Sequence, residues 1–136
     1  MNFEIDHLGV AVQSLANAKQ FYENMGLKVV GEETVAAEKV NVAMVPVGES
    51  RIELLEATSQ ESTIAKFIAK RGEGLHHVAL RVSDLAATVE RLKQNGTRLI
   101  SEDIKVGAGG HLYIFVHPSS TGGVLLELCE DPPQGV

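Results

Sequence analysis

The stretch that decides the fold occurs twice in this chain. HLGVAVQSLANAKQFYENMGLKVV, residues 7–30, aligns without a gap with HVALRVSDLAATVERLKQNGTRLI, residues 77–100. The offset between the two stretches is 77 − 7 = 70 residues, and Leu15 and Leu85 keep it. A repeat of this length is too long for a short solenoid unit. The sequence therefore predicts one module that is used twice.

A second pair of stretches extends the duplication. PVGESRIELLE, residues 46–56, resembles PSSTGGVLLELCE, residues 118–130. In this alignment Glu53 matches Glu127, at an offset of 127 − 53 = 74 residues. The drift from 70 to 74 is what insertions in loops would cause, so both ends of the module are duplicated.

Each copy is expected to begin with a strand. Residues 7–12 alternate between aliphatic side chains and small or polar ones, which is the period-two pattern of a half-buried strand. Leu8, Val10 and Val12 lie on one predicted face, and His7 lies on the other face with two small residues. The second copy repeats this pattern from His77.

A helix is expected to follow each strand. In the first copy, the i, i+3, i+4, i+7 spacing predicts one apolar stripe, made of Ala18, Phe21, Tyr22 and Met25. Gly26 supplies a left-handed residue after the helix. In the second copy, Ser83 or Asp84 can cap a helix that ends before Gly96, and its stripe consists of Leu85, Val89 and Leu92.

Three further strands complete each predicted module. They cover residues 27–31, 40–47 and 51–56 in the first copy, and residues 97–101, 111–117 and 124–130 in the second. Residues 62–71 read as a helix that connects the copies. The predicted fold class is α+β, with two tandem βαβββ modules.

The composition excludes several classes of protein. The 136 residues include 12 Lys and Arg against 18 Asp and Glu, and no stretch gathers the basic residues, so neither nucleic acid nor an anionic membrane is expected as a partner. The apolar runs are too short to span a bilayer, and no secretory signal is expected. Cys129 is the single cysteine, which predicts no intrachain disulfide and a reducing, cytoplasmic setting.

Four residues recur at matched positions and point to metal chemistry. His7 and His77 are predicted to face away from the aliphatic side of their strands, and Glu53 and Glu127 each lie between two aliphatic residues. If a pseudo-twofold axis relates the modules, two imidazoles and two carboxylates can converge near it. Such a set favours a divalent ion such as Mn, Co, Ni or Zn, with room for two further ligands.

Structural roles are the alternative for each of these residues. A single His at a strand start is usually a hydrogen-bonded core or rim residue, and a single Glu in a strand usually lies on a solvated face. The recurrence of both residue types in both copies favours the metal site. His76 is expected to be structural or to support the site, and Cys129 is expected to be a packed thiol. The glycines of residues 107–110 are expected to form a flexible turn.

These features resemble a known group of proteins, the vicinal oxygen chelate superfamily, which includes glyoxalases, bleomycin resistance proteins and dioxygenases. Within it, the chain most resembles the methylmalonyl-CoA epimerase family. The segments that support this are DHLGVAV (6–12), RIELLE (51–56), GLHHVALRV (74–82) and GAGGHLYIFVHPSSTGGVLLEL (107–128). The first three also occur in glyoxalase-like relatives, and the last is more specific to the epimerases.

The resemblance implies a single domain over residues 1–136, built from repeats 1–58 and 74–130 and a helical connector, 59–73. Its sheet would be mixed and curved around a metal-binding cavity. The implied ligands of the divalent metal are His7, Glu53, His77 and Glu127. Some epimerases have glutamine at the second ligand position, so Glu53 is an accepted variant. A homodimer is also expected, because small paired modules leave open sheet edges.

The implied reaction is epimerisation of methylmalonyl-CoA, an acyl-CoA substrate, by proton abstraction and return at the α-carbon through a metal-stabilised enolate. Glu127 is expected to transfer one proton, and Glu53 or a water near Asn41 the other. Asn41 matches the position where some epimerases have an unligated carboxylate. The family's Lys after the HP pair is Ser119 here, and Lys105 or Arg51 is a candidate contact for the anionic ester.

Other activities of the same superfamily remain open from the sequence. A glyoxalase I-type lyase would use the same ligand types on a glutathione hemithioacetal. An extradiol-type oxygenase needs Fe(II) with two His and one carboxylate, and four candidate ligands argue against it. An antibiotic-sequestering protein would need no metal-ligand quartet.

Overall fold

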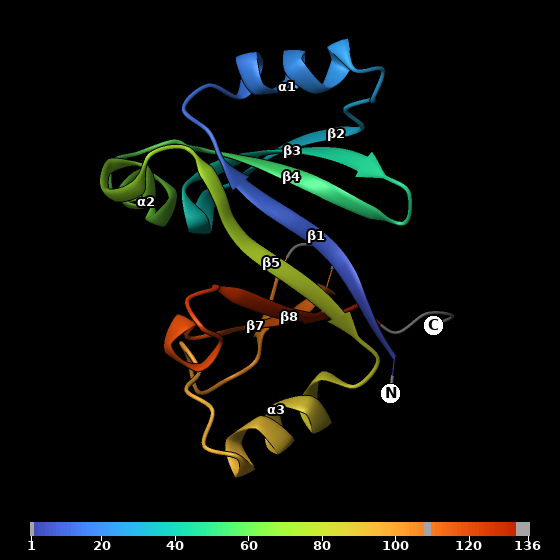
Figure 1. Cartoon of the computed structure of the whole chain (residues 1–136), viewed down its shortest axis with the longest axis vertical. Coiled ribbons are helices and arrows are strands. Elements are labelled where there is room, and N and C mark those ends of the chain that lie inside the picture. Colours follow the sequence, from blue (N-terminus) through green and yellow to red (C-terminus); the bar gives the residue numbers. More distant parts are fainter. Residues whose placement is uncertain (1, 108–109, 133–136) are drawn as a thin grey trace. The chain divides into compact units, whose positions relative to one another are not determined.

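The computed structural model describes residues 2–107 and 110–132 (Figure 1). The chain forms two compact units, one made of His7–His76 and the other of Met1–Asp6 with His77–Val136. The middle of the predicted glycine turn, residues 108 and 109, lies outside the described residues. The predicted repeat boundaries, 1–58 and 74–130, stay predictions.

The unit formed by residues 7–76 has the βαβββ order that the sequence predicts. Its elements, with the preceding residues of the first strand included, are β1 (Phe3–Ala11), α1 (Leu15–Asn24), β2 (Gly31–Val35), η1 (Ala36–Glu38), β3 (Val40–Val47), β4 (Ser50–Ala57) and α2 (Thr63–Arg71). The strands lie in the order β2-β3-β4-β1. β1 is parallel to β4 and the other pairs are antiparallel, so the sheet is mixed.

The second unit repeats this topology. Its elements, again with the whole of the first strand, are β5 (Gly74–Val82), α3 (Leu85–Gln94), β6 (Lys105–Val106), β7 (Leu112–Val116), η3 (Pro118–Ser120) and β8 (Leu126–Glu130). The strand order is β5-β8-β7-β6, with β5 parallel to β8. The α+β class, the tandem βαβββ modules and the helix predicted at 62–71 are confirmed. Across residues 2–107 and 110–132, no helix is long and apolar enough to cross a membrane.

The aliphatic face of each first strand packs on the helix of its own module, as the alternation predicts. Val10 and Val12 join the cluster beneath α1, and Val82 joins the cluster beneath α3. The predicted stripe of α1 was partly wrong, because Phe21 and Met25 are 60% and 65% exposed. The residues of α1 that pack on the sheet are Leu15, Ala18 and Tyr22. The helix begins at Leu15, and this buried residue sets which side of the helix faces the strands.

Two predicted strands differ from the observed ones. Residues 27–31 were predicted as a strand, but β2 begins at Gly31, because η1 joins β2 to β3 closely and fixes Val35 opposite Val40. Residues 97–101 form no strand and make only an isolated bridge between Leu99 and Val116. The observed β6 has two residues, too short to show a period of two.

The helix caps agree with the sequence and add one feature that it did not reveal. Ser14 caps α1 and Asp84 caps α3 through their side chains. In addition, Glu56 accepts a hydrogen bond from the Leu15 backbone N–H at 2.9 Å, and Glu130 accepts one from Leu85 at 2.7 Å. The last strand of each module therefore satisfies one of the free N–H groups that begin its helix.

Glu130→Ala is expected to lower the free energy of unfolding by about 1–2 kcal/mol, because a charge-assisted hydrogen bond to a helix N-terminus is lost. Urea unfolding followed by circular dichroism measures this. Glu90→Ala, an exposed change on the same helix, is the control and should shift the free energy by less than about 0.5 kcal/mol. An equal effect of both changes would contradict the capping role of Glu130.

Candidate metal centre

The strand pairing of each module places a carboxylate beside a small residue. In the first unit, Gly9 of β1 lies opposite Glu53 of β4. In the second, Ala79 of β5 lies opposite Glu127 of β8. The small residue follows the predicted histidine by two positions in both modules, so it shares the histidine's face of the sheet. Each carboxylate therefore has room to reach its own module's imidazole.

The first His–Glu pair lies within the unit of residues 7–76. His7 is 5% exposed, and its Nδ1 lies 3.3 Å from Oε2 of Glu53, whose side chain is 14% exposed. Beyond His7, the same face of the sheet packs on α2 through Ala11, Leu55 and Ile64. The pair is therefore held at the edge of an apolar cluster.

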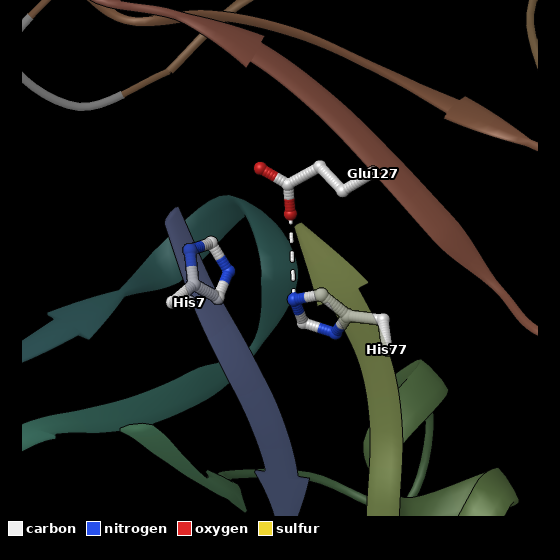
Figure 2. A group of neighbouring side chains, drawn as sticks. All are labelled: His7, His77 and Glu127. Atoms are coloured by element: carbon white, nitrogen blue, oxygen red, sulfur yellow. Dashed lines mark ion pairs between the residues drawn. The ribbon is translucent and has the colours of Figure 1, made fainter. Parts of the chain in front are cut away.

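The second pair repeats this geometry in the other unit. His77 is 6% exposed, and its Nε2 lies 3.3 Å from Oε1 of Glu127, whose side chain is also 14% exposed. Figure 2 shows this contact as a dashed line, with His77 on β5 and Glu127 reaching from β8. The ring of Phe115 meets the His77 ring edge-on at 5.7 Å between centroids. Phe115 also lies opposite Glu127 in the sheet, so it limits the freedom of both side chains.

Both pairs fit a divalent ion. Two ligand atoms that each lie about 2.1 Å from one ion are about 3.0 Å apart at a right angle and about 3.4 Å apart at a tetrahedral angle. The observed separations of 3.3 Å fall within that range. Imidazole nitrogen with carboxylate oxygen suits Mn, Co, Ni or Zn. The four predicted ligands thus occur as two matched pairs, and their joint binding of one ion stays a prediction.

Arg51 is placed differently from its expected role as an acyl-CoA contact. Its Nε donates to Oε2 of Glu53 at 2.8 Å, and Nη2 lies 2.7 Å from the same oxygen. The two residues are two positions apart on β4, so they share a face. Sequence reasoning had the signal for this contact, an i, i+2 pair of opposite charges in a strand, but did not use it.

The position of Asn41 rules out its predicted part in proton transfer. Asn41 lies opposite Glu56, whereas Glu53 lies opposite Met44, so Asn41 is on the α1 side of the sheet. Its Oδ1 accepts from the Thr34 hydroxyl at 2.6 Å, and its Nδ2 donates to Glu56 at 3.3 Å. These groups line a cavity of about 380 Å³ beside α1. A water held by Asn41 is therefore separated from Glu53 by the sheet.

The remaining histidines have local contacts. The ring of His76 meets Phe67 edge-on at 5.0 Å, which agrees with a structural role. His117 Nδ1 accepts from the Ser119 backbone N–H at 3.0 Å, and His111 lies 3.4 Å from Asp131.

Cys129 is a packed thiol, as predicted. It is buried, and its Sγ lies 3.6 Å from the carbonyl oxygen of Leu80. Burial raises the pKa of the Cys129 thiol to about 12, and the carboxylates of Asp6, Glu127 and Asp131 add to the increase. Thiolate chemistry at this position is therefore suppressed.

Known proteins match the chain over most of its length. The family model for the Glyoxalase/Bleomycin resistance protein/Dioxygenase superfamily matches residues 6–115. The mitochondrial methylmalonyl-CoA epimerase of Bos taurus is 40% identical over 126 residues, which cover 91% of this chain and 72% of that protein.

Solved structures agree in fold. The crystal structure of methylmalonyl-CoA epimerase from Mycobacterium tuberculosis has a TM-score of 0.88 at 38% identity, over 96% of this chain and 89% of that chain. A Streptomyces coelicolor methylmalonyl-CoA epimerase in complex with 2-nitronate-propionyl-CoA has a TM-score of 0.88 at 32% identity, over 94% of each chain.

Cys129 is expected to react with a thiol reagent at pH 8 about a thousandfold more slowly in the folded protein than in urea. A pKa of about 12 leaves on the order of one thiol in ten thousand ionised at that pH, against about a quarter for an ordinary cysteine. Colour release from a disulfide reagent measures the rate. Folded protein that reacts as fast as unfolded protein would contradict the packed assignment.

Proposed function

The chain belongs to the methylmalonyl-CoA epimerase family of the glyoxalase/bleomycin resistance protein/dioxygenase superfamily, and on that premise we propose that it epimerises methylmalonyl-CoA with the aid of a divalent metal ion. We propose His7, Glu53, His77 and Glu127 as the metal ligands. The observation that supports this most is the duplication of one His–Glu pair at the same register and the same 3.3 Å separation.

The proposed substrate is a thioester with a carboxylate on its α-carbon. When bound, a divalent ion would supply Lewis acidity toward the oxygens of the thioester and of that carboxylate. The four side chains offer two imidazole nitrogens and carboxylate oxygens as ligands. An octahedral ion would keep two positions for oxygens of the substrate.

The two carboxylates are the proposed proton-transfer groups. Epimerisation needs one group to remove the α-proton from one face and another to return a proton to the opposite face. We assign the first role to Glu127 and the second to Glu53, or the reverse for the other epimer. To take the proton, a carboxylate oxygen must face the α-carbon rather than a cation, because a cation favours the ionised carboxylate.

The local surroundings favour proton transfer. Glu53 lies opposite Met44 and Glu127 opposite Phe115, so a large apolar side chain flanks each carboxylate in the sheet. Both carboxylates are mostly shielded from solvent. Apolar, shielded surroundings weaken the hydration of a carboxylate and make it a better base.

The enzyme is expected to exchange the α-proton of methylmalonyl-CoA for deuterium in deuterated water. Glu127→Gln, assayed with saturating Co²⁺, should lower the exchange rate by about a hundredfold to ten-thousandfold, because the amide cannot accept the proton. Mass spectrometry of the thioester measures the exchange. Glu90→Gln, at an exposed site, is the matched control.

Two results would contradict this function. Exchange by Glu127→Gln at the unaltered rate would remove Glu127 from the chemistry. Absence of exchange with metal-loaded enzyme, together with turnover of a glutathione hemithioacetal, would favour the glyoxalase I-type alternative. The imidazole–carboxylate pairs could also be direct hydrogen bonds without an ion, and failure of the folded protein to bind Co²⁺, Mn²⁺, Ni²⁺ or Zn²⁺ would show this.

Asn41→Ala is expected to leave the exchange rate within about threefold of the unaltered enzyme, because Asn41 faces α1 rather than Glu53. The same deuterium assay measures it. A loss of a hundredfold or more in a variant of normal stability would restore the role that the sequence suggested for Asn41.

The predicted homodimer and cytoplasmic setting remain part of this proposal. One cysteine, buried and without a disulfide, agrees with a reducing compartment.

A further inference from the structure

The two modules differ beside their carboxylates. The offset that matches Glu53 with Glu127 matches Arg51 with Leu125, since 125 − 51 = 74. The backbone register, the small residue across the strand and the distance to the imidazole are the same in both modules. At this position, therefore, the first carboxylate receives a guanidinium group and the second an aliphatic side chain.

The guanidinium is well placed to fix the Glu53 side chain. Two nitrogens of Arg51 contact Glu53 Oε2, at 2.8 Å and 2.7 Å, and His7 Nδ1 lies 3.3 Å from the same atom. Within residues 2–107 and 110–132, the hydrogen bonds and ion pairs of Glu53 all end on Oε2. The lone pairs of Oε1 are then available to a cation. Charge-assisted contacts of this length are the stronger class of hydrogen bond.

We propose that Arg51 is a positioning residue, which fixes Glu53 as the rigidly held carboxylate ligand of the metal ion. This inference rests on the proposed function and refines it. A glutamate that is already held loses less side-chain freedom when it binds an ion than a mobile one does. Glu127, with Leu125 at the matching position, is left as the carboxylate with more freedom to turn between ion and substrate.

A competing effect acts in the opposite direction. The positive guanidinium repels a nearby dication, and removal of Arg51 would then strengthen metal binding. Supporting groups that orient a metal ligand usually dominate, and their loss weakens binding about 10- to 100-fold. The Arg51 side chain is also 31% exposed, so water reduces the repulsion. We therefore expect orientation to outweigh repulsion.

The test is a calorimetric titration of metal-free protein with Co²⁺. Arg51→Leu, which copies the second module, should weaken Co²⁺ binding about 10- to 100-fold. Arg51→Lys should recover part of the loss, because it keeps one charged donor. Arg91→Leu, which removes an exposed arginine from α3, is the matched control and should leave the affinity unchanged. Arg51→Met keeps the apolar stem and replaces Arg51→Leu if that variant fails to fold.

Two further arms separate positioning from other roles. In a Glu53→Ala background, Arg51→Leu should change the Co²⁺ affinity by less than about threefold, because it acts through Glu53. At saturating Co²⁺, Arg51→Leu should keep KM for methylmalonyl-CoA within about threefold. A large rise in KM with unchanged Co²⁺ affinity would instead make Arg51 a substrate contact, as the sequence suggested, and would overturn the proposal.

Unchanged or tighter Co²⁺ binding by Arg51→Leu would also overturn the proposal, and the epimerase function would stand. If unaltered protein binds no Co²⁺, the metal site fails and the role of Arg51 fails with it. Deuterium exchange by that same metal-free protein then decides whether the epimerase function survives. The two failures are thus distinguishable.

Discussion

The parallel pairing of the first and last strands of each module is the constraint on which the rest of the site depends. Gly9 opposite Glu53 and Ala79 opposite Glu127 bring a carboxylate to its histidine without steric conflict. A slip of one residue would turn every side chain to the other face. Burial of Leu54 beneath α1 prevents this slip, because a shifted strand would place Glu53 in the apolar core.

The same strands connect the site to the helices. Glu53 and Glu56 are three residues apart on β4, so they lie on opposite faces, one at the histidine and one at the N-terminus of α1. Glu127 and Glu130 repeat the arrangement on β8 with α3. One strand thus positions a ligand and caps a helix. The geometry of each His–Glu pair therefore depends on the stability of the core behind it.

Duplication gave the two carboxylates the same backbone, and their neighbours make them different. Arg51 contacts Glu53, whereas the matching position beside Glu127 is Leu125. Epimerisation itself requires two groups that act on opposite faces of one carbon, and chemically identical groups are not needed. A matched backbone with unmatched neighbours suits such a reaction, because it fixes the positions while the environments vary.

The sequence by itself determined the duplicated βαβββ order, the caps of both helices and the faces that His7 and His77 occupy. These follow from local signals: a period of two, a period of 3.6 and residues that can satisfy free N–H groups. Such signals extend over a few residues, so sequence reasoning succeeded wherever a neighbour along the chain decides the outcome.

Only the tertiary structure decided which side chains meet. The exposure of Phe21, the side of the sheet that Asn41 occupies and the Arg51–Glu53 contact each depend on strand register and on the rotation of a helix against the sheet. These are set by the burial of apolar groups distant in sequence, which no local period encodes.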